Sequence, residues 1–226
     1  LPEPRRPGVG RQLLLRFLRG SAPQSPQRRP HLLDLGCGNG RFLHFLEQAE
    51  LSFEYLGIDA SLPLLGLAVQ RAPSQRWLAA DLTHLAPLGH EARFDIVAAL
   101  ALLHHIPSLR LRRQLLRGSV DRLRANGLLL VSHWQFEGVP SLLDRRIEWE
   151  DVGEVGVDDL EEGDHLLAWG QRTTPGPTPY RYCHHTTDRE ADELTQGLPL
   201  QLVSQFLSDG RTGELNLYRI YRRTRT

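Results

Sequence analysis

The chain has 226 residues, of which 40% are hydrophobic and 24% charged, a composition typical of one globular domain. Its 27 basic residues are all arginine and are balanced by 27 acidic residues, so the chain as a whole carries no excess positive charge. The arginines around 110–124 could still form a local basic face. Two cysteines are too few for a disulfide scaffold and show no metal-ligand spacing, so we expect no metal and a reducing cytoplasm. No apolar run approaches the roughly 20 residues of a membrane span, so we expect no membrane association.

Residues 1–30 are predicted to form an N-terminal helix, over 11–18, and a proline-rich linker. Residues 31–135 then alternate between short apolar runs and helical patterns. The predicted strands cover 31–35, 54–59, 76–80, 94–99 and 127–133, and the predicted helices cover about 40–49, 62–72 and 109–123. This alternation predicts an α/β fold with a parallel sheet and crossover helices.

The alternation stops at residues 136–197, which are acidic and rich in glycine and proline before a predicted helix near 188–196. We expect an insertion after the fifth strand, over the carboxyl-terminal edge of the sheet. Residues 198–226 hold two further predicted strands, 200–207 and 213–222, which suit an antiparallel closing hairpin. The prediction is one domain over 1–226, with seven mostly parallel strands and an antiparallel last strand.

A glycine-rich loop follows the first predicted strand. Gly36, Gly38 and Gly40 stand in a GxGxG pattern, where the absence of side chains lets the backbone turn sharply and approach a ligand. The spacing differs from the GxGxxG pattern of dinucleotide enzymes. We therefore expect a ligand above this loop and a different cofactor from a dinucleotide.

Acidic residues come at the ends of successive predicted strands. Asp59 ends the second strand, where its carboxylate can accept hydrogen bonds from ribose hydroxyls, with Ala60 as a further expected contact. Asp81 follows the third strand, and the backbone of Leu82 beside it can donate to an adenine ring. Asp34, in the first strand, can hold the loop and face a cationic group. Singly, each acid is also a common turn former or helix cap.

This ordered set resembles the class I S-adenosylmethionine-dependent methyltransferases over about residues 30–135. The resemblance implies S-adenosylmethionine as the cofactor and a Rossmann-like, class I methyltransferase sheet. The segment Leu103-His104-His105-Ile106-Pro107 looks like the one that follows the family's fourth strand. His105 is a candidate catalytic residue, and packing beside the cofactor is the alternative.

A second resemblance covers about residues 160–195. The stretch Gly163-Asp164-His165-Leu166 through Trp169, and Arg181-Tyr182-Cys183-His184 after it, are similar to the tRNA wobble-uridine (carboxymethyluridine) methyltransferase family and its bacterial relatives. The resemblance implies that this segment closes over the substrate. The pocket and candidate catalytic residues that it implies are Arg181, His184, Trp169 and Tyr182, together with Tyr180.

Arg181 is the most specific of these candidates, because a planar guanidinium can align a carboxylate or a phosphate. The aromatic residues Trp134, Trp169, Tyr180 and Tyr182 could stack a base. The alternative is an ordinary strand in which the two tyrosines pack and Arg181 points into water. The sequence departs from the eukaryotic pattern at Ala168, Cys183 and His133-Trp134.

Three functions are compared on this basis. The first is methylation of a carboxymethyl-type wobble uridine of tRNA, with tRNA as partner and, as the resemblance implies, a small zinc-binding activator protein. The second is O-methylation of a small acid or phenol. The third is a non-catalytic subunit that binds the cofactor and activates a partner. The intact glycine loop with Asp34, Asp59 and Asp81 argues against loss of cofactor binding and says nothing about the acceptor.

Overall fold

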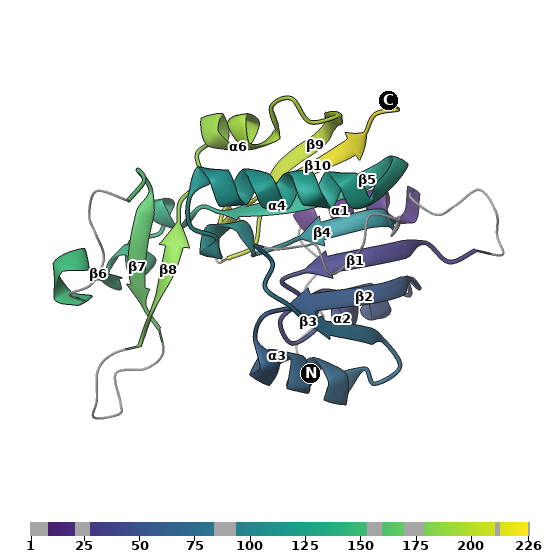
Figure 1. The fold of residues 1–226 in the computed structure, drawn as a ribbon, viewed down its shortest axis with the longest axis horizontal. Helices are drawn as coiled ribbons and strands as arrows, with labels where there is room; N and C mark the ends of the chain where they lie inside the picture. The colour runs from purple at the N-terminus through teal and green to yellow at the C-terminus, as the bar shows by residue number, and fades with distance from the viewer. Residues whose placement is uncertain are drawn as a thin grey trace.

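The computed structural model describes residues 9–20, 28–83, 94–152, 160–169, 179–210 and 213–225. A seven-stranded sheet forms its centre, in the order β3-β2-β1-β4-β5-β10-β9 (Figure 1). The strands are β1 (His31–Leu35), β2 (Glu54–Asp59), β3 (Arg76–Ala79), β4 (Phe94–Ala99), β5 (Leu123–Trp134), β9 (Leu200–Ser208) and β10 (Asn216–Arg223). All neighbouring pairs from β3 to β5 are parallel, and β10 is antiparallel to both β5 and β9. The predicted sheet is confirmed, and its strand ends shift by only a few residues.

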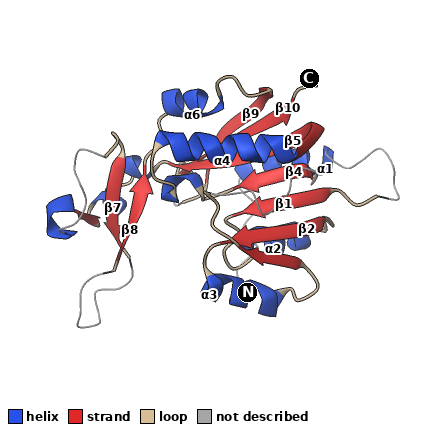
Figure 2. Ribbon diagram, in the orientation of Figure 1, coloured by secondary structure: helices blue, strands red, loops and turns tan. Residues whose placement is uncertain are grey.

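Helices cover both faces of this sheet (Figure 2). On one face, α4 (Leu109–Arg122) and α6 (Asp188–Thr195) bury Leu115, Leu116 and Leu194 against β1, β4 and β5. On the other face, α1 (Val9–Gly20) and α2 (Arg41–Gln48) bury their leucines against the alternate residues of the same strands. The two cores therefore follow from the period-two alternation of the strands. α3 (Leu62–Arg71) packs beside β2 and β3.

The segment after β5 contains a second, smaller sheet. It is antiparallel, in the order β6-β7-β8, and its strands are β6 (Arg146–Ile147), β7 (Asp164–Ala168) and β8 (Tyr180–His184). The 3-10 turn η3 (Phe136–Gly138), the short helix α5 (Pro140–Leu143) and the turn η4 (Trp149–Val152) complete the segment. The small sheet stands beside the carboxyl ends of the parallel strands (Figure 1), the edge at which open α/β sheets bind ligands.

Candidate cofactor and acceptor site

The glycine loop leaves β1 with three left-handed backbone positions: φ is +70° at Gly36, +54° at Gly38 and +79° at Gly40. Residues with a side chain rarely adopt these angles, so the loop requires glycine. A Cβ added at Gly38 would meet only Leu64 Cδ1, at 3.9 Å, so space is open above the middle of the loop. The loop therefore offers the room and the close backbone approach that an S-adenosyl ligand needs.

Asp59 ties the loop to the next helix. Its Oδ2 accepts a hydrogen bond from the Gly38 N–H, and its Oδ1 accepts one from the Ser61 N–H, both at 2.8 Å. Each carboxylate oxygen has a second lone pair, so Asp59 retains acceptor capacity for the hydroxyls of a ligand. Ala60, next in the chain, is exposed at the same edge.

Replacing Asp59 with alanine is expected to weaken S-adenosylmethionine binding roughly tenfold to a hundredfold, because the variant can no longer form charge-assisted hydrogen bonds to the ligand. Glu54→Ala provides the control, since Glu54 is an exposed acid at the opposite end of β2. Calorimetric titration measures both variants. Equal affinity of the Asp59 variant and the unaltered chain would show that this carboxylate does not contact the cofactor.

Asp34 lies under the loop as a buried carboxyl group. The Tyr55 hydroxyl donates to its Oδ2 at 2.5 Å. Burial raises the pKa of Asp34 from 3.8 to about 7, the Tyr55 hydrogen bond opposes that rise, and the charge of Asp59 adds to it. The group is therefore poised to ionise when a cation binds nearby.

This pKa predicts how stability changes with pH. The native chain keeps a proton on Asp34 that the unfolded chain releases between pH 3.8 and about 7, so the free energy of unfolding falls as pH rises through that range. The full loss is roughly 4 kcal/mol at most. In Asp34→Asn this contribution disappears. Urea unfolding at several pH values gives the free energy of unfolding of both chains. If it changes with pH in the same way in both, Asp34 does not have a raised pKa in the folded chain.

The end of β3 completes this edge of the sheet. The Ala80 N–H donates to the carbonyl oxygen of Asp59 at 3.1 Å, which fixes the segment that carries Asp81 beside β2. Asp81 Oδ1 accepts from both the N–H and the hydroxyl of Thr83, at 2.9 and 2.8 Å, and the side chain of Leu82 is buried. The predicted cofactor residues thus gather at the carboxyl edge of β1, β2 and β3.

A histidine pair follows β4 in the turn η2 (Leu103–His105). The rings of His104 and His105 lie 4.1 Å apart between centroids, and His104 lies 5.0 Å from the Trp134 ring. His105 Nδ1 lies 3.1 Å from the carbonyl oxygen of Tyr182, which can only accept, so Nδ1 carries the proton. Desolvation lowers the pKa of His105, the hydrogen bond to Tyr182 opposes this, and the charge of Arg181 lowers it further. A neutral His105 presents Nε2 as an acceptor.

The Arg181 guanidinium lies against two indole rings. The guanidinium carbon lies 3.8 Å from the Trp169 ring centroid and 5.1 Å from that of Trp134. Trp134 is buried, whereas Trp169 is 53% exposed. In the parts of the chain that the structure describes, no carboxylate forms an ion pair with Arg181, and its Nε is buried without a hydrogen-bond partner. Stacking fixes the plane of this cation and leaves it available to an anion.

Tyr182 and His184 point elsewhere, because successive side chains of a strand alternate between faces. The Tyr182 hydroxyl donates to Asp164 Oδ1 at 2.6 Å. His184 is buried, with Nδ1 2.6 Å from Asp164 Oδ1 and Nε2 2.8 Å from Glu190 Oε2. Burial lowers the pKa of His184, but the two carboxylates outweigh it and the net pKa is raised. The structure therefore groups Arg181, Trp169 and His105. It places His184 in a separate ion-pair cluster, to which Tyr182 is joined by its hydrogen bond to Asp164.

Arg112 of α4 centres that cluster, which we call the β8 clamp and define as Arg112, Asp164, Glu161, His184 and Glu190. Arg112 is 1% exposed and donates to Glu161 Oε2 at 2.6 Å, to Glu190 Oε1 at 2.7 Å and to the Ile106 carbonyl oxygen at 3.1 Å. It therefore joins α4, α6 and η2 to the small sheet. The sequence analysis did not identify Arg112 as a site residue, because it counted the arginines around 110–124 only as a local basic face.

Three members of the β8 clamp could in principle hold a metal, because ligand atoms of Glu161, Asp164 and His184 lie within 4.8 Å of one another. The same atoms already serve hydrogen bonds and ion pairs to Arg112, Tyr182 and each other. Two cations and three carboxylates face one another there, so we interpret the cluster as a structural joint between the two sheets.

The sheet order, the glycine loop and the acid at the end of β2 have the arrangement of the class I S-adenosylmethionine-dependent methyltransferase fold. Residues 33–129 match the family model described as a methyltransferase domain. A SAM-dependent methyltransferase from Methanosarcina mazei has the same fold, with a TM-score of 0.68 and 21% identity over 88% of this chain and 95% of that one.

Two curated relatives match part of this domain. The chain is 30% identical to a tRNA (carboxymethyluridine(34)-5-O)-methyltransferase of Arabidopsis thaliana over 106 residues, which are 47% of this chain and 24% of the relative. It is 35% identical to a trans-aconitate 2-methyltransferase of Delftia acidovorans over 76 residues, 34% of this chain and 28% of the relative. The chain thus spans under a third of either relative. Within the part of the chain with described structure, no helix has the length and apolarity to cross a bilayer.

Proposed function

We propose that this protein transfers the methyl group of S-adenosylmethionine to a carboxylate oxygen. The observation that carries this proposal is Arg181, a cation that lies against Trp134 and Trp169 and has no ion-pair partner among the described residues. His105 contacts the backbone of Tyr182 and follows β4, so it links this cation to the edge of the sheet where the glycine loop lies. The segment 136–197 then covers the acceptor.

The residues suit an ester-forming reaction. A bound S-adenosylmethionine supplies an electrophilic methyl group on a sulfonium. A carboxylate is already ionised at neutral pH, so the chain has to align it and exclude water, and no strong base is needed. Arg181 offers two parallel N–H donors to the two oxygens of the carboxylate, and neutral His105 accepts from a neighbouring donor group of the acceptor.

The proposed acceptor is a carboxymethyl-type wobble uridine of tRNA. Relatives from Arabidopsis thaliana and Saccharomyces cerevisiae bear that activity in their names. The ring of Trp169 is half exposed beside Arg181, where an unstacked base can lie against it. An acceptor that carries both a base and a carboxylate would stack its base on Trp169 and bind its carboxylate to Arg181.

The test is mass spectrometry of tRNA nucleosides from cells with and without the gene. We expect loss of a methyl ester of a carboxymethylated uridine, with the free acid accumulating in its place. An unchanged nucleoside profile would contradict the tRNA acceptor.

A small carboxylic acid is the second candidate acceptor. Trans-aconitate is a carboxylic acid, so the relatives named for it support the same reaction on a metabolite. The formal net charge of zero fits a small acid as well as it fits RNA. Incubating the purified chain with trans-aconitate and labelled cofactor tests this candidate directly.

A further inference from the structure

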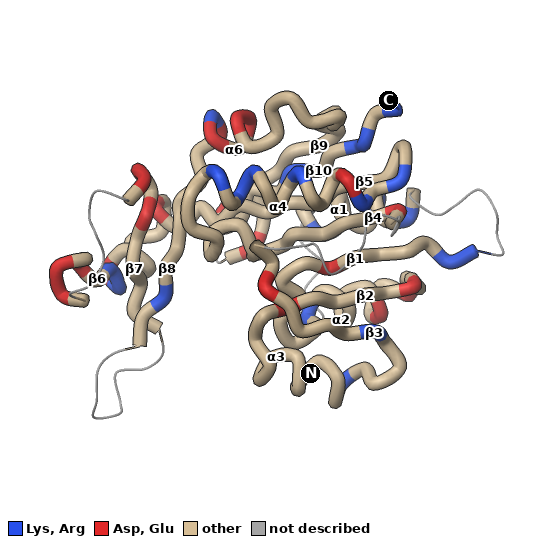
Figure 3. Tube along the Cα trace, viewed as in Figure 1, with Lys and Arg blue, Asp and Glu red and all other residues tan. Residues whose placement is uncertain are grey.

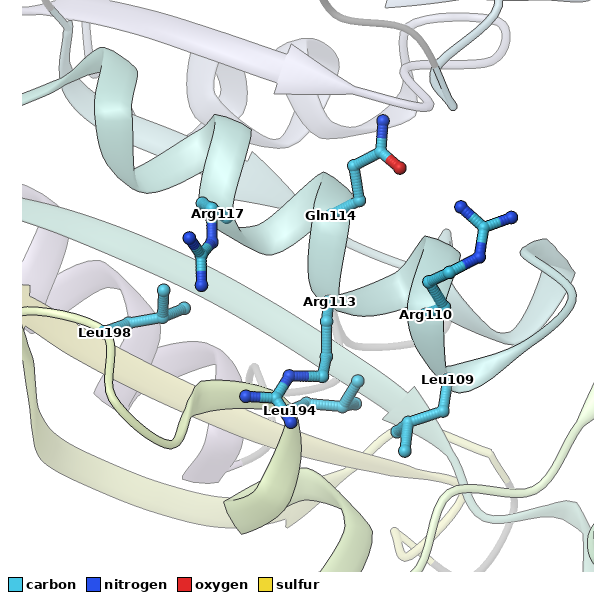
Figure 4. Close-up of a pocket in the computed structure, with 7 residues that line it drawn as sticks. All are labelled: Leu109, Arg110, Arg113, Gln114, Arg117, Leu194 and Leu198. Atoms are coloured by element: carbon cyan, nitrogen blue, oxygen red, sulfur yellow. The ribbon is translucent and has the colours of Figure 1, made fainter.

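A groove separate from the cofactor loop and from Arg181 runs between α4 and the end of α6. Its volume is about 480 Å³, and Figure 4 shows the side chains that line it. We call it the arginine groove and define it by its lining residues, Leu109, Arg110, Arg113, Gln114, Arg117, Leu194 and Leu198. Three leucines form its apolar part and three arginines its basic part.

The arginines lie on one side of α4, because Arg110, Arg113 and Arg117 are spaced by three and then four residues. At 1.5 Å of rise per residue they span roughly 10 Å along the helix. Arg113 and Arg117 extend toward Leu194 and Leu198, whereas Arg110 extends from the outer side of the helix (Figure 4). Figure 3, which marks the charged residues on the trace of the chain, shows several basic positions along α4.

Three of the four acids of α6 are paired with other groups. Asp188 and Asp192 bind Arg219 at 3.3 and 2.6 Å, and Glu190 belongs to the β8 clamp. The fourth acid, Glu193, is exposed. Within the described ranges, no ion pair joins Arg110, Arg113 or Arg117 to a carboxylate. Arg113 donates to the carbonyl oxygen of Gln196, at 3.3 Å. The row therefore remains a local positive field on a chain of zero net charge.

We propose that the arginine groove binds the sugar-phosphate backbone of the RNA acceptor. This inference rests on the proposed tRNA acceptor and adds where the rest of that molecule docks. A polynucleotide offers regularly spaced negative charges that match a row of arginines along a helix. The row is also continuous with the acceptor site, because α4 starts directly after η2, whose His105 contacts β8 beside Arg181.

The test is the double charge reversal Arg110→Glu/Arg117→Glu, compared with Arg16→Glu/Arg19→Glu. The control arginines are exposed on α1, which covers the opposite face of the sheet. Arg113 stays unchanged because it holds Gln196. The probe is an in vitro transcribed tRNA, and fluorescence anisotropy gives the Kd between roughly 50 and 200 mM salt.

We expect the α4 variant to bind this tRNA at least about tenfold more weakly. The slope of log K against log salt should fall by about 1.4–1.8, because two arginines no longer neutralise phosphates. The α1 variant should bind like the unaltered chain. Circular dichroism checks the fold, and Arg110→Gln/Arg117→Gln repeats the test if the reversal unfolds the chain. Equal binding by both variants, or an equal decrease in both, overturns the proposal.

Two further outcomes separate this inference from the proposed activity. A chain that esterifies a small carboxylate but binds no tRNA overturns the groove while methyl transfer stands. A chain that binds tRNA through the groove yet transfers no methyl group supports the groove and overturns the activity. If only binding of a polyglutamate probe falls in the α4 variant, the groove serves an acidic protein and the RNA proposal is wrong.

Discussion

Replacing Arg181 with alanine is expected to lower the rate of methyl transfer roughly a hundredfold, because a charged group that orients the acceptor stabilises the transition state by a few kcal/mol. Binding of S-adenosylmethionine should not change, since the glycine loop and Asp59 lie on other elements. Single-turnover kinetics at saturating cofactor measures the chemical step apart from cofactor binding.

The conservative variant and a matched control sharpen this prediction. Arg181→Lys should recover little activity, because an ammonium keeps the charge but has neither the planar fork nor its stacking on Trp169. Arg146→Ala removes an exposed arginine from the same small sheet and should leave the rate unchanged. If all three variants keep the rate of the unaltered chain, Arg181 is an ordinary strand residue and does not bind the acceptor.

Replacing Gly38 with valine is expected to abolish measurable binding of S-adenosylmethionine. The branched side chain would occupy the open space above the loop, and φ of +54° is strained for any residue with a Cβ, most of all a β-branched one. The expected loss of affinity exceeds that of the Asp59 variant, because both the space and the backbone path change.

The control is Gly20→Val at the end of α1, where an added Cβ meets nothing within 4 Å. Calorimetric titration and thermal unfolding are measured on both variants. We expect the Gly38 variant to remain folded and to give no binding heat. A folded Gly38 variant with normal affinity would remove the glycine loop from the cofactor site.

The cofactor half of the site could be predicted from sequence because its residues lie at or just beyond the carboxyl ends of strands. Asp59 ends β2 and Asp81 comes two residues after the neighbouring strand β3, so their positions in the chain place them at one edge of the parallel sheet. The structure adds that Asp59 also accepts from the Gly38 N–H, a contact that depends on the loop conformation.

The acceptor half depends on contacts between distant segments, and sequence reasoning resolved less of it. The Arg112 partners Glu161 and Glu190 lie 49 and 78 residues away, and neither distance follows from a local pattern. For the same reason His184 was predicted in the substrate pocket, whereas the structure places both of its ring nitrogens against carboxylates. The insertion was predicted, but β6 and β7 were not.

The strand interpretation of Arg181 is correct for the backbone, because β8 spans Tyr180–His184. The same interpretation is wrong for two of the side chains. It predicts a packed Tyr180 and an Arg181 that points into water, whereas Tyr180 is exposed and the Arg181 guanidinium lies against two indole rings. Burial of an arginine beside Trp134 could not be read from the alternation of residues alone, since Trp134 comes from β5 of the other sheet.

The most direct measurement incubates the purified chain and its Arg181→Ala variant with methyl-labelled S-adenosylmethionine and either carboxymethyluridine-containing tRNA or trans-aconitate. The product is then treated with mild base, which hydrolyses a methyl ester and releases the label as methanol. We predict base-labile label on at least one acceptor from the unaltered chain and roughly a hundredfold less from the variant. Label that stays on the acceptor after base treatment, or equal labelling by both chains, would contradict carboxylate methylation at Arg181.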